Sequence, residues 1–217
     1  MKVLPVILSC LKNKHLWQNL LTKHQYSIIF CGAKINREYI LHGRILYLNC
    51  DDNYEGLPEK IICMINAILQ IKRFSHITHI IKIDDHDTNM SNLKQNLNSM
   101  RPIINANDYL GQSINYQQLK YGEFKGVVDW HFNKCSKKSH WYNKLYTGIY
   151  TPWADGGCGY ILSVNAMRLI NSKYGPKDKE IVSKNHIFED LMIALILYEH
   201  NIHPVKIDNV IVGDKYR

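Results

Sequence analysis

Nine residues, HIIKIDDHD at positions 79–87, decide how this chain is expected to fold. An apolar run stops at three carboxylates, those of Asp84, Asp85 and Asp87. Carboxylates this close repel one another unless a cation or solvent offsets their charge. Open α/β sheets bind ligands beyond the carboxyl ends of their strands. We therefore predict a buried strand that ends at a divalent cation and a diphosphate, because such cations take oxygen ligands and often hold phosphates. The alternative is a polar turn, in which Asp is common.

Alternating strand and helix patterns surround this stretch. Short apolar runs rich in β-branched residues predict the strands, and three- and four-residue apolar spacing predicts the helices. The predicted strands cover residues 3–9, 27–31, 45–48 and 77–83, and the predicted helices cover residues 11–22 and 57–74. This alternation indicates an α/β fold with a mainly parallel central sheet and helices on both faces.

The second half of the chain differs from the first in composition and in predicted secondary structure. Residues 101–152 are rich in Asn, Tyr, Gly and Lys, with a β-like piece at residues 126–132. Such loops usually carry specificity. A helix is predicted from Ser163, a good N-cap residue, to about Asn171, and another from Glu189 to about His200. We expect a single domain over residues 1–217, because no repeat or linker is evident.

Composition narrows the class of partner. The net charge of +8 and the pI near 9.1 favour anionic partners such as nucleotides, although a solvated basic surface explains much of this charge. No run of five Lys or Arg occurs, so we expect no nucleic-acid partner. The apolar run at residues 3–8 is too short for a transmembrane segment and reads as a strand, which favours a cytoplasmic protein.

The cysteine pattern favours free thiols. No C-x-x-C pair occurs, and most of the cysteines lie inside apolar runs, which disfavours zinc. The six are Cys10, Cys31, Cys50, Cys63, Cys135 and Cys158.

Two later segments carry further chemistry. Residues 153–160, WADGGCGY, hold three glycines in four residues, so the backbone can approach a ligand while nearby aromatic rings stack on a sugar. The alternative is that these residues form a structural loop before a helix. Residues 186–190, HIFED, place acidic side chains in the first turn of a predicted helix. The helix dipole favours acidic residues there, which is the structural interpretation. The functional interpretation is that one of these carboxylates serves as a general base.

In their order, these segments resemble the galactosyltransferase-type inverting enzymes of glycosyltransferase family 31, which have the GT-A fold. The family's motifs are matched at residues 52–60 (Asp-x-Tyr-x-x-Leu-x-x-Lys), 82–87 (Lys-x-Asp-Asp-Asp), 109–111 (Tyr-Leu-Gly), 141–142 (Trp-Tyr), 150–153 (aromatic-Pro-aromatic), 157–163 (Gly-x-Gly-Tyr-x-Leu-Ser), 189–191 (Glu-Asp-Val) and 201–204 (Gly-Ile-x-Pro). Departures include His86, which stands where the family has its third Asp. The absence of a membrane anchor and of paired cysteines fits a cytosolic bacterial or virus-encoded variant.

The resemblance implies a function. A sugar would move from a UDP-sugar donor to a hydroxyl of a glycan or glycoprotein, with inversion and with Mn²⁺ or Mg²⁺ as cofactor. Residues 1–100 would form the nucleotide-sugar half and residues 101–217 the acceptor-binding and catalytic half.

The same resemblance, read with the residue patterns, assigns candidate roles. The metal ligands would be Asp85 and Asp87, and Asp190 would be the general base. The donor would be bound by Ser9, Cys10, Asp52, Tyr54, Lys60 and Asp84, and the acceptor by Trp153, Asp155, Gly156, Gly157 and Glu189.

The sequence alone leaves three alternative functions open. A phosphotransferase of the haloacid dehalogenase type uses Asp-x-Asp-x-Thr after its first strand, and residues 85–88 come close to that motif. A sugar-nucleotide pyrophosphorylase would need a glycine-rich loop after the first strand, and residues 9–14 contain no glycine. A non-catalytic sugar-binding module would use the aromatic loops and would not need the acidic strand end.

Overall fold

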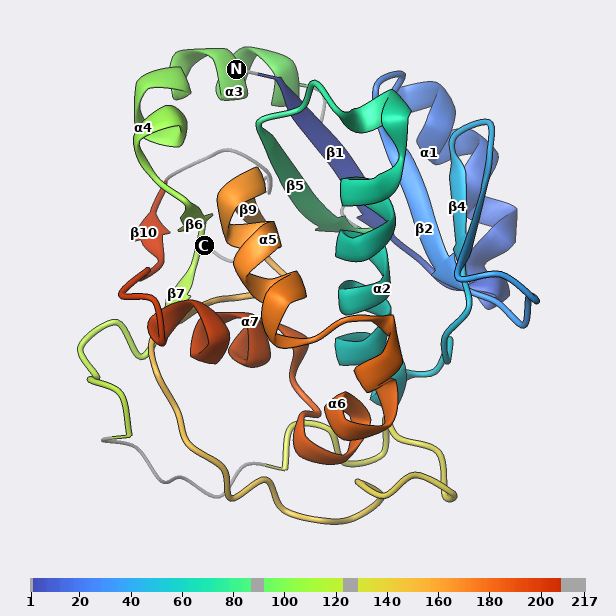
Figure 1. The fold of residues 1–217 in the computed structure, drawn as a ribbon, viewed down its shortest axis with the longest axis vertical. Helices are drawn as coiled ribbons and strands as arrows, with labels where there is room; N and C mark the ends of the chain where they lie inside the picture. The colour runs from blue at the N-terminus through green and yellow to red at the C-terminus, as the bar shows by residue number, and fades with distance from the viewer. Residues whose placement is uncertain (1, 87–91, 123–128, 208–217) are drawn as a thin grey trace.

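The computed structural model describes residues 2–86, 92–122 and 129–207. Its centre is an eight-stranded sheet in the order β10-β6-β9-β5-β1-β2-β4-β3 (Figure 1). The strands are β1 (Val3–Leu8), β2 (Ile28–Gly32), β3 (Tyr39–His42), β4 (Ile45–Leu48), β5 (His79–Asp84), β6 (Tyr109–Gly111), β9 (Tyr160–Ser163) and β10 (Val205–Lys206). A separate two-stranded sheet pairs β7 (Ile114–Asn115) with β8 (Trp153–Ala154).

Most of the sheet is parallel, as predicted. β1 pairs in parallel with β2 and β5, β2 with β4, and β6 with β10. Antiparallel pairing enters at β3, on one edge, and at β9, which lies between β5 and β6. β5 is therefore a central strand, and the pairing of Leu8 with Asp84 places the ends of β1 and β5 side by side.

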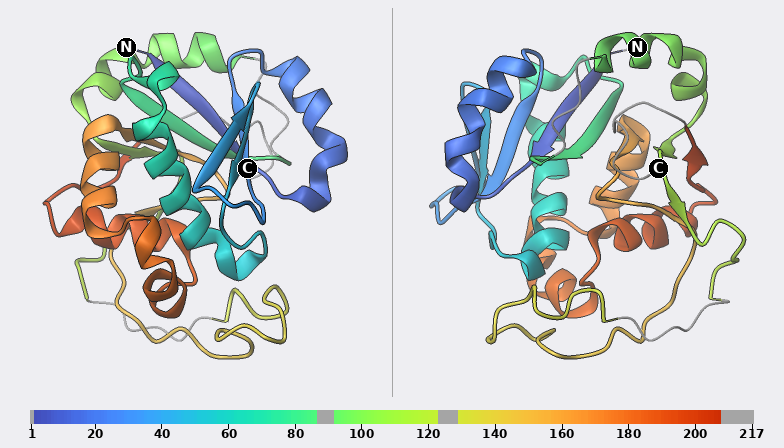
Figure 2. Two further views of the ribbon diagram at one scale, coloured as in Figure 1. Left: turned by 45° about the vertical axis from the view of Figure 1, so that its right-hand side comes forward. Right: turned by 180° about the vertical axis from the view of Figure 1, so that it is seen from behind.

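Helices cover both faces of the sheet (Figures 1 and 2). One face carries α2 (Leu57–Gln70), α5 (Val164–Lys173), α6 (Lys179–Asn185) and α7 (Glu189–Tyr198), and the other carries α1 (Trp17–Lys23), α3 (Leu93–Ser99) and α4 (Arg101–Ala106). Successive strand residues feed opposite cores, because side chains alternate along a strand. Val6 and Ile80 join the first core, whereas Ile7 and Ile81 join the second. The predicted α/β fold is confirmed.

Several predicted boundaries were wrong. The helix predicted over residues 57–74 ends at Gln70, because Ile71 adopts extended backbone, and a 3₁₀ turn, η3 (Lys72–Phe74), follows. The helix predicted over residues 11–22 begins as a 3₁₀ segment, η1 (Leu11–Leu16), before α1. Two further 3₁₀ turns are η2 (Tyr54–Gly56) and η4 (Pro176–Asp178). The β-like piece at residues 126–132 forms no strand over residues 129–132, and its first three residues lie outside the described part of the chain.

Other predictions hold in the structure. Ser163 is the N-cap of α5, and its hydroxyl accepts a hydrogen bond from the Ala166 amide at 3.0 Å. α7 begins at Glu189, as predicted, and ends at Tyr198. All six cysteines are free thiols, four of them buried.

Candidate active site

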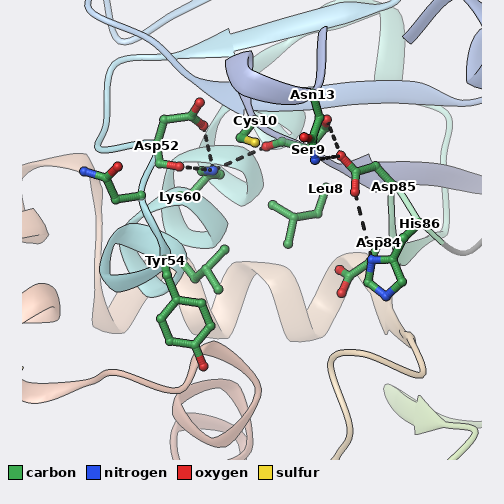
Figure 3. Close-up of a pocket in the computed structure, with 12 residues that line it drawn as sticks. Leu8, Ser9, Cys10, Asn13, Asp52, Tyr54, Lys60, Asp84, Asp85 and His86 are labelled. Atoms are coloured by element: carbon green, nitrogen blue, oxygen red, sulfur yellow. Dashed lines mark hydrogen bonds and ion pairs between the residues drawn. The ribbon is translucent and has the colours of Figure 1, made fainter. Parts of the chain in front are cut away.

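The carboxyl ends of β1 and β5 border a cavity of about 210 Å³, which we call the strand-end cavity (Figure 3). The cavity lies where a parallel sheet is expected to bind its ligand. Seven of the predicted donor and metal residues line it: Ser9, Cys10, Asp52, Tyr54, Lys60, Asp84 and Asp85. The eighth, Asp87, lies outside the described residues. The structure thus brings together side chains that lie up to 76 positions apart in the chain.

Asp85 is a buried carboxylate of this cavity, and side chains from the segment after β1 hold it in place. The residue is 9% exposed, and its Oδ2 accepts hydrogen bonds from Ser9 Oγ at 2.7 Å and from Asn13 Nδ2 at 2.9 Å. The indole of Trp17 donates to Ser9 Oγ at 2.8 Å, which orients that hydroxyl. The other oxygen, Oδ1, lies 4.0 Å from His86 Nδ1. No role was assigned to Asn13 or Trp17 from the sequence. The one feature that could have indicated them is a predicted helix directly after a strand end.

Asp52 and Lys60 brace the opposite wall of the cavity. Asp52 Oδ1 accepts from Lys60 Nζ at 2.7 Å and from the Gly32 amide at 2.8 Å, and its Oδ2 accepts from the Leu11 amide at 2.7 Å. Lys60 is 1% exposed, and a buried ammonium needs such a partner. The same ammonium donates to the Ser9 carbonyl at 3.3 Å. This pair therefore ties the last residue of β2 to the segment that follows β1.

A second buried lysine, Lys82, joins the acidic strand end to the glycine loop. Lys82 Nζ lies 2.6 Å from Asp84 Oδ1 and 3.1 Å from Glu189 Oε1, and it donates to the Gly156 carbonyl at 2.9 Å. Burial lowers the pKa of Lys82, but Asp84 and Glu189 more than offset this, so its pKa is raised and its charge is secure. Glu189 Oε2 accepts from the Tyr160 hydroxyl at 2.8 Å. Sequence reasoning left Lys82 unassigned, although a lysine inside an apolar strand was the available signal.

Asp190 stands on the other side of the same loop, in the first turn of α7. Its Oδ2 accepts from the Gly156 amide at 2.9 Å, and its Oδ1 accepts from the Leu191 amide at 2.8 Å. Burial, followed by the nearby charge of Glu189, raises the pKa of Asp190 to about 7, against the pull of these two hydrogen bonds. A carboxylate whose pKa lies near 7 is suited to accept a proton from a hydroxyl at neutral pH.

The glycine loop is held in shape by Asp155. Its Oδ1 accepts from the Gly157 amide at 2.8 Å and the Cys158 amide at 3.1 Å. A Cβ at Gly156 would lie 2.6 Å from Glu189 Oε1, so only glycine fits between the two acidic residues and the loop. The predicted acceptor residues Asp155, Gly156, Gly157 and Glu189 are thus neighbours, but the carboxylates of Asp155 and Glu189 are engaged by the protein.

Aromatic side chains stand around this loop. The ring of Trp153, the remaining predicted acceptor residue, lies 5.1 Å from Tyr116 and 5.8 Å from Tyr150 between centroids. Lys134 Nζ lies 5.4 Å from the ring centre of Tyr54 and 4.6 Å from that of Trp130. Tyr54 also lines the strand-end cavity, and burial, followed by the charge of Asp190, raises the pKa of its hydroxyl. Lys134 and the exposed Trp130 were missed because nothing in the loop sequence points to a partner.

The described residues offer part of a set of metal ligands. They hold no group of three or more His, Cys, Asp or Glu side chains that could bind a metal ion. The two carboxylates at the strand end, Asp84 and Asp85, nevertheless supply the oxygen donors that Mg²⁺ and Mn²⁺ prefer. Each uses one oxygen in a protein contact, to Lys82 in one case and to Ser9 and Asn13 in the other. The chemistry of these donors fits a hard cation that takes its remaining ligands elsewhere.

The architecture is a mixed α/β sheet of the GT-A-like kind, with acidic residues and a candidate base at its carboxyl edge. The model of the family described as Galactosyltransferase matches residues 32–208, which is most of the chain. The chain belongs to this family and is a glycosyltransferase. A search of curated protein sequences gives no significant match. Within the described residues, no helix has the length and apolar character needed to span a membrane.

Proposed function

We propose that this protein transfers a sugar from a UDP-sugar to a hydroxyl of a glycan or glycoprotein acceptor, with inversion at the anomeric carbon. One observation carries the proposal. Asp190 is joined to Asp84 through two residues, because Gly156 donates its amide to Asp190 and accepts from Lys82, which pairs with Asp84. A candidate base and a candidate diphosphate site are therefore held in one rigid network.

In this proposal the strand-end cavity holds the donor. The hydrogen bonds to Asp85 and Asp52 fix the carboxylates and the backbone around the cavity before the donor arrives. Such preorganisation avoids reorganisation during the reaction. Mn²⁺ or Mg²⁺ would be held by Asp85 with Asp87, and Asp84 would contact the donor. When bound, the ion would offset the negative charge that grows on the departing diphosphate.

Asp190 performs the proton transfer in this proposal. Its ionised carboxylate takes the proton of the acceptor hydroxyl as the oxygen attacks the anomeric carbon and the bond to the diphosphate breaks. A pKa of about 7 makes it a stronger base than an ordinary carboxylate while leaving about half of the groups ionised at neutral pH. Inversion needs only this one carboxylate, placed on the face opposite the leaving group.

The test is UDP release from a panel of UDP-sugars, with and without Mn²⁺, by the wild type and by Asp85→Asn. We expect release that needs the metal, occurs with one or a few of the sugars, and falls at least about 100-fold in the variant, the scale on which removal of one stabilising group acts. The exposed Asp129→Asn serves as the matched control and keeps wild-type release. Release that is independent of metal, or none with any UDP-sugar, would overturn the proposal.

A further inference from the structure

A second and larger cavity, of about 720 Å³, lies at the opposite end of the sheet. We call it the rear cavity. It opens at the first residues of β1 and β2, between the turn after α1, the turn η3 and the helix α3. Figures 1 and 2 show α3 beside the start of β1, away from the strand ends that border the donor site. β1 has six residues, which span roughly 20 Å. The two cavities are therefore separate sites.

The rear cavity has an unbalanced charge. Five Lys or Arg side chains line it, and no Asp or Glu does. They are Lys2, Lys23, Arg44, Arg73 and Lys94. None of the five takes part in an ion pair within the described part of the chain. Arg44 and Arg73 instead donate to backbone carbonyls, which orients them without neutralising them. Cations that gather in a concave site raise the local concentration of anions.

The floor of the rear cavity is apolar. It is formed by residues of both strands and of the surrounding turns and helix, among them Leu4, Ile28, Phe74, Leu93 and Leu97. All five are buried at 9% exposure or less. A volume of this size lies in the range of cavities that hold small organic ligands. An inorganic anion would satisfy the cations but would leave this floor uncovered.

One cation of the rear cavity is held in place by backbone groups. Arg44 donates to the His24 carbonyl at 2.9 Å and to the Leu21 carbonyl at 2.6 Å. Both acceptors are uncharged, so the guanidinium is oriented at the cavity and keeps its full charge. A fixed guanidinium suits an anionic head group, because its planar fork matches a carboxylate or a phosphate.

We propose that the rear cavity binds an anionic amphiphile, with its phosphate or carboxylate head on the basic rim and its hydrocarbon chain on the apolar floor. The same chemistry can come from a free single-chain amphiphile or from a phospholipid of a bilayer. The site is independent of sugar transfer, because no residue of the strand-end cavity lines it.

The test uses monomeric lysophosphatidylglycerol, below its micelle concentration, with the full chain. We expect saturable binding, and much weaker binding of a monoacylglycerol with the same chain but no charge. The variant Lys23→Gln/Arg73→Gln/Lys94→Gln removes three exposed cations of the rim and should weaken binding about 100-fold, since each basic side chain near an anionic head contributes a factor of about five. A second variant, Asn98→Trp, fills the cavity from α3 and should weaken binding while every cation remains.

The matched control is Lys137→Gln/Lys138→Gln/Lys177→Gln, which removes three exposed cations outside the cavity. It should keep wild-type binding, and all variants should keep wild-type UDP release. Retention on phosphatidylglycerol vesicles as well as binding of the monomer would assign a bilayer lipid as the source, and monomer binding alone would assign a free amphiphile. The proposal is overturned if the monomer does not bind saturably, if the control triple variant weakens binding equally, or if only vesicles retain the protein.

Discussion

Replacing Asp190 by Asn should change how the stability of the protein depends on pH. The pKa of this carboxyl is about 7 in the folded protein, against 3.8 for an ordinary Asp. The folded state therefore holds a proton that the unfolded state has released over most of this interval. As pH rises from 3.8 towards 7, the free energy of unfolding falls, because the unfolded chain gains its preferred charged form first. Above pH 7 the contribution is constant.

The size of the effect follows from the two pKa values. Each pH unit between them costs about 1.4 kcal/mol, so the wild type should lose about 2–3 kcal/mol between pH 5 and pH 8 from this group alone. The side chain is partly exposed, and water screens part of that cost, so we expect about 1–3 kcal/mol. The amide group introduced by Asp190→Asn has one acceptor oxygen for two backbone donors, those of Gly156 and Leu191, and the lost hydrogen bond costs about 1–3 kcal/mol at every pH.

The assay is urea unfolding at pH 5, 6, 7 and 8, followed by tryptophan fluorescence. The stability of Asp190→Asn minus that of the wild type should rise by about 1–3 kcal/mol over this range. The same difference for the exposed Asp129→Asn should stay flat. The reasoning is refuted if the Asp190→Asn difference does not change, or falls, as the pH rises, because the carboxyl would then have no raised pKa.

Three further predictions concern the network around the glycine loop. Lys82→Met leaves the buried Glu189 and the partly buried Asp84 without their cation and should destabilise the protein by about 3–5 kcal/mol in urea unfolding. Lys184→Met, which breaks an exposed pair, should cost less than about 1 kcal/mol, and equal losses would contradict the buried network. Gly156→Ala forces a Cβ against Glu189 and should cost about 1–3 kcal/mol, while Gly175→Ala, whose Cβ meets only an ordinary contact at 3.8 Å, should be nearly neutral by the same measurement. In the pH profile of transfer, kcat/KM should rise through an apparent pKa of about 7 as Asp190 ionises, and a flat profile between pH 5.5 and pH 8 would remove it as the base.

The sequence predicts the core of this fold well because the core is locally encoded. The apolar run before the acidic cluster could only be a buried strand, and strand ends of a parallel sheet meet at one edge. That rule, read together with the family resemblance, brought Ser9, Asp52 and Asp85 into one predicted site, and the structure places all three at the strand-end cavity. β9 and β3 were not predicted as antiparallel members, because strand direction depends on connections that no local pattern records.

The site's connecting network could not be predicted for a related reason. Lys82 and Gly156 are 74 positions apart, and their contact exists only because β9 pairs with β5. The buried lysine was visible in the sequence, but its partners were not. The pKa of Asp190 has the same origin, since burial by the folded loop causes most of its rise. The motifs identified the residues at the strand ends, whereas the environment of Asp190 follows from tertiary contacts.

The most direct test of the central claim compares binding and transfer in Asp190→Asn. The dissociation constant of the preferred UDP-sugar should stay close to the wild-type value, because Asp190 does not line the strand-end cavity. Transfer to the acceptor in a single turnover should fall by about 10²–10⁴-fold, the usual contribution of a general base. Transfer that stays within about tenfold of wild type, or loss of donor binding instead of transfer, would contradict the assignment of Asp190 as the base.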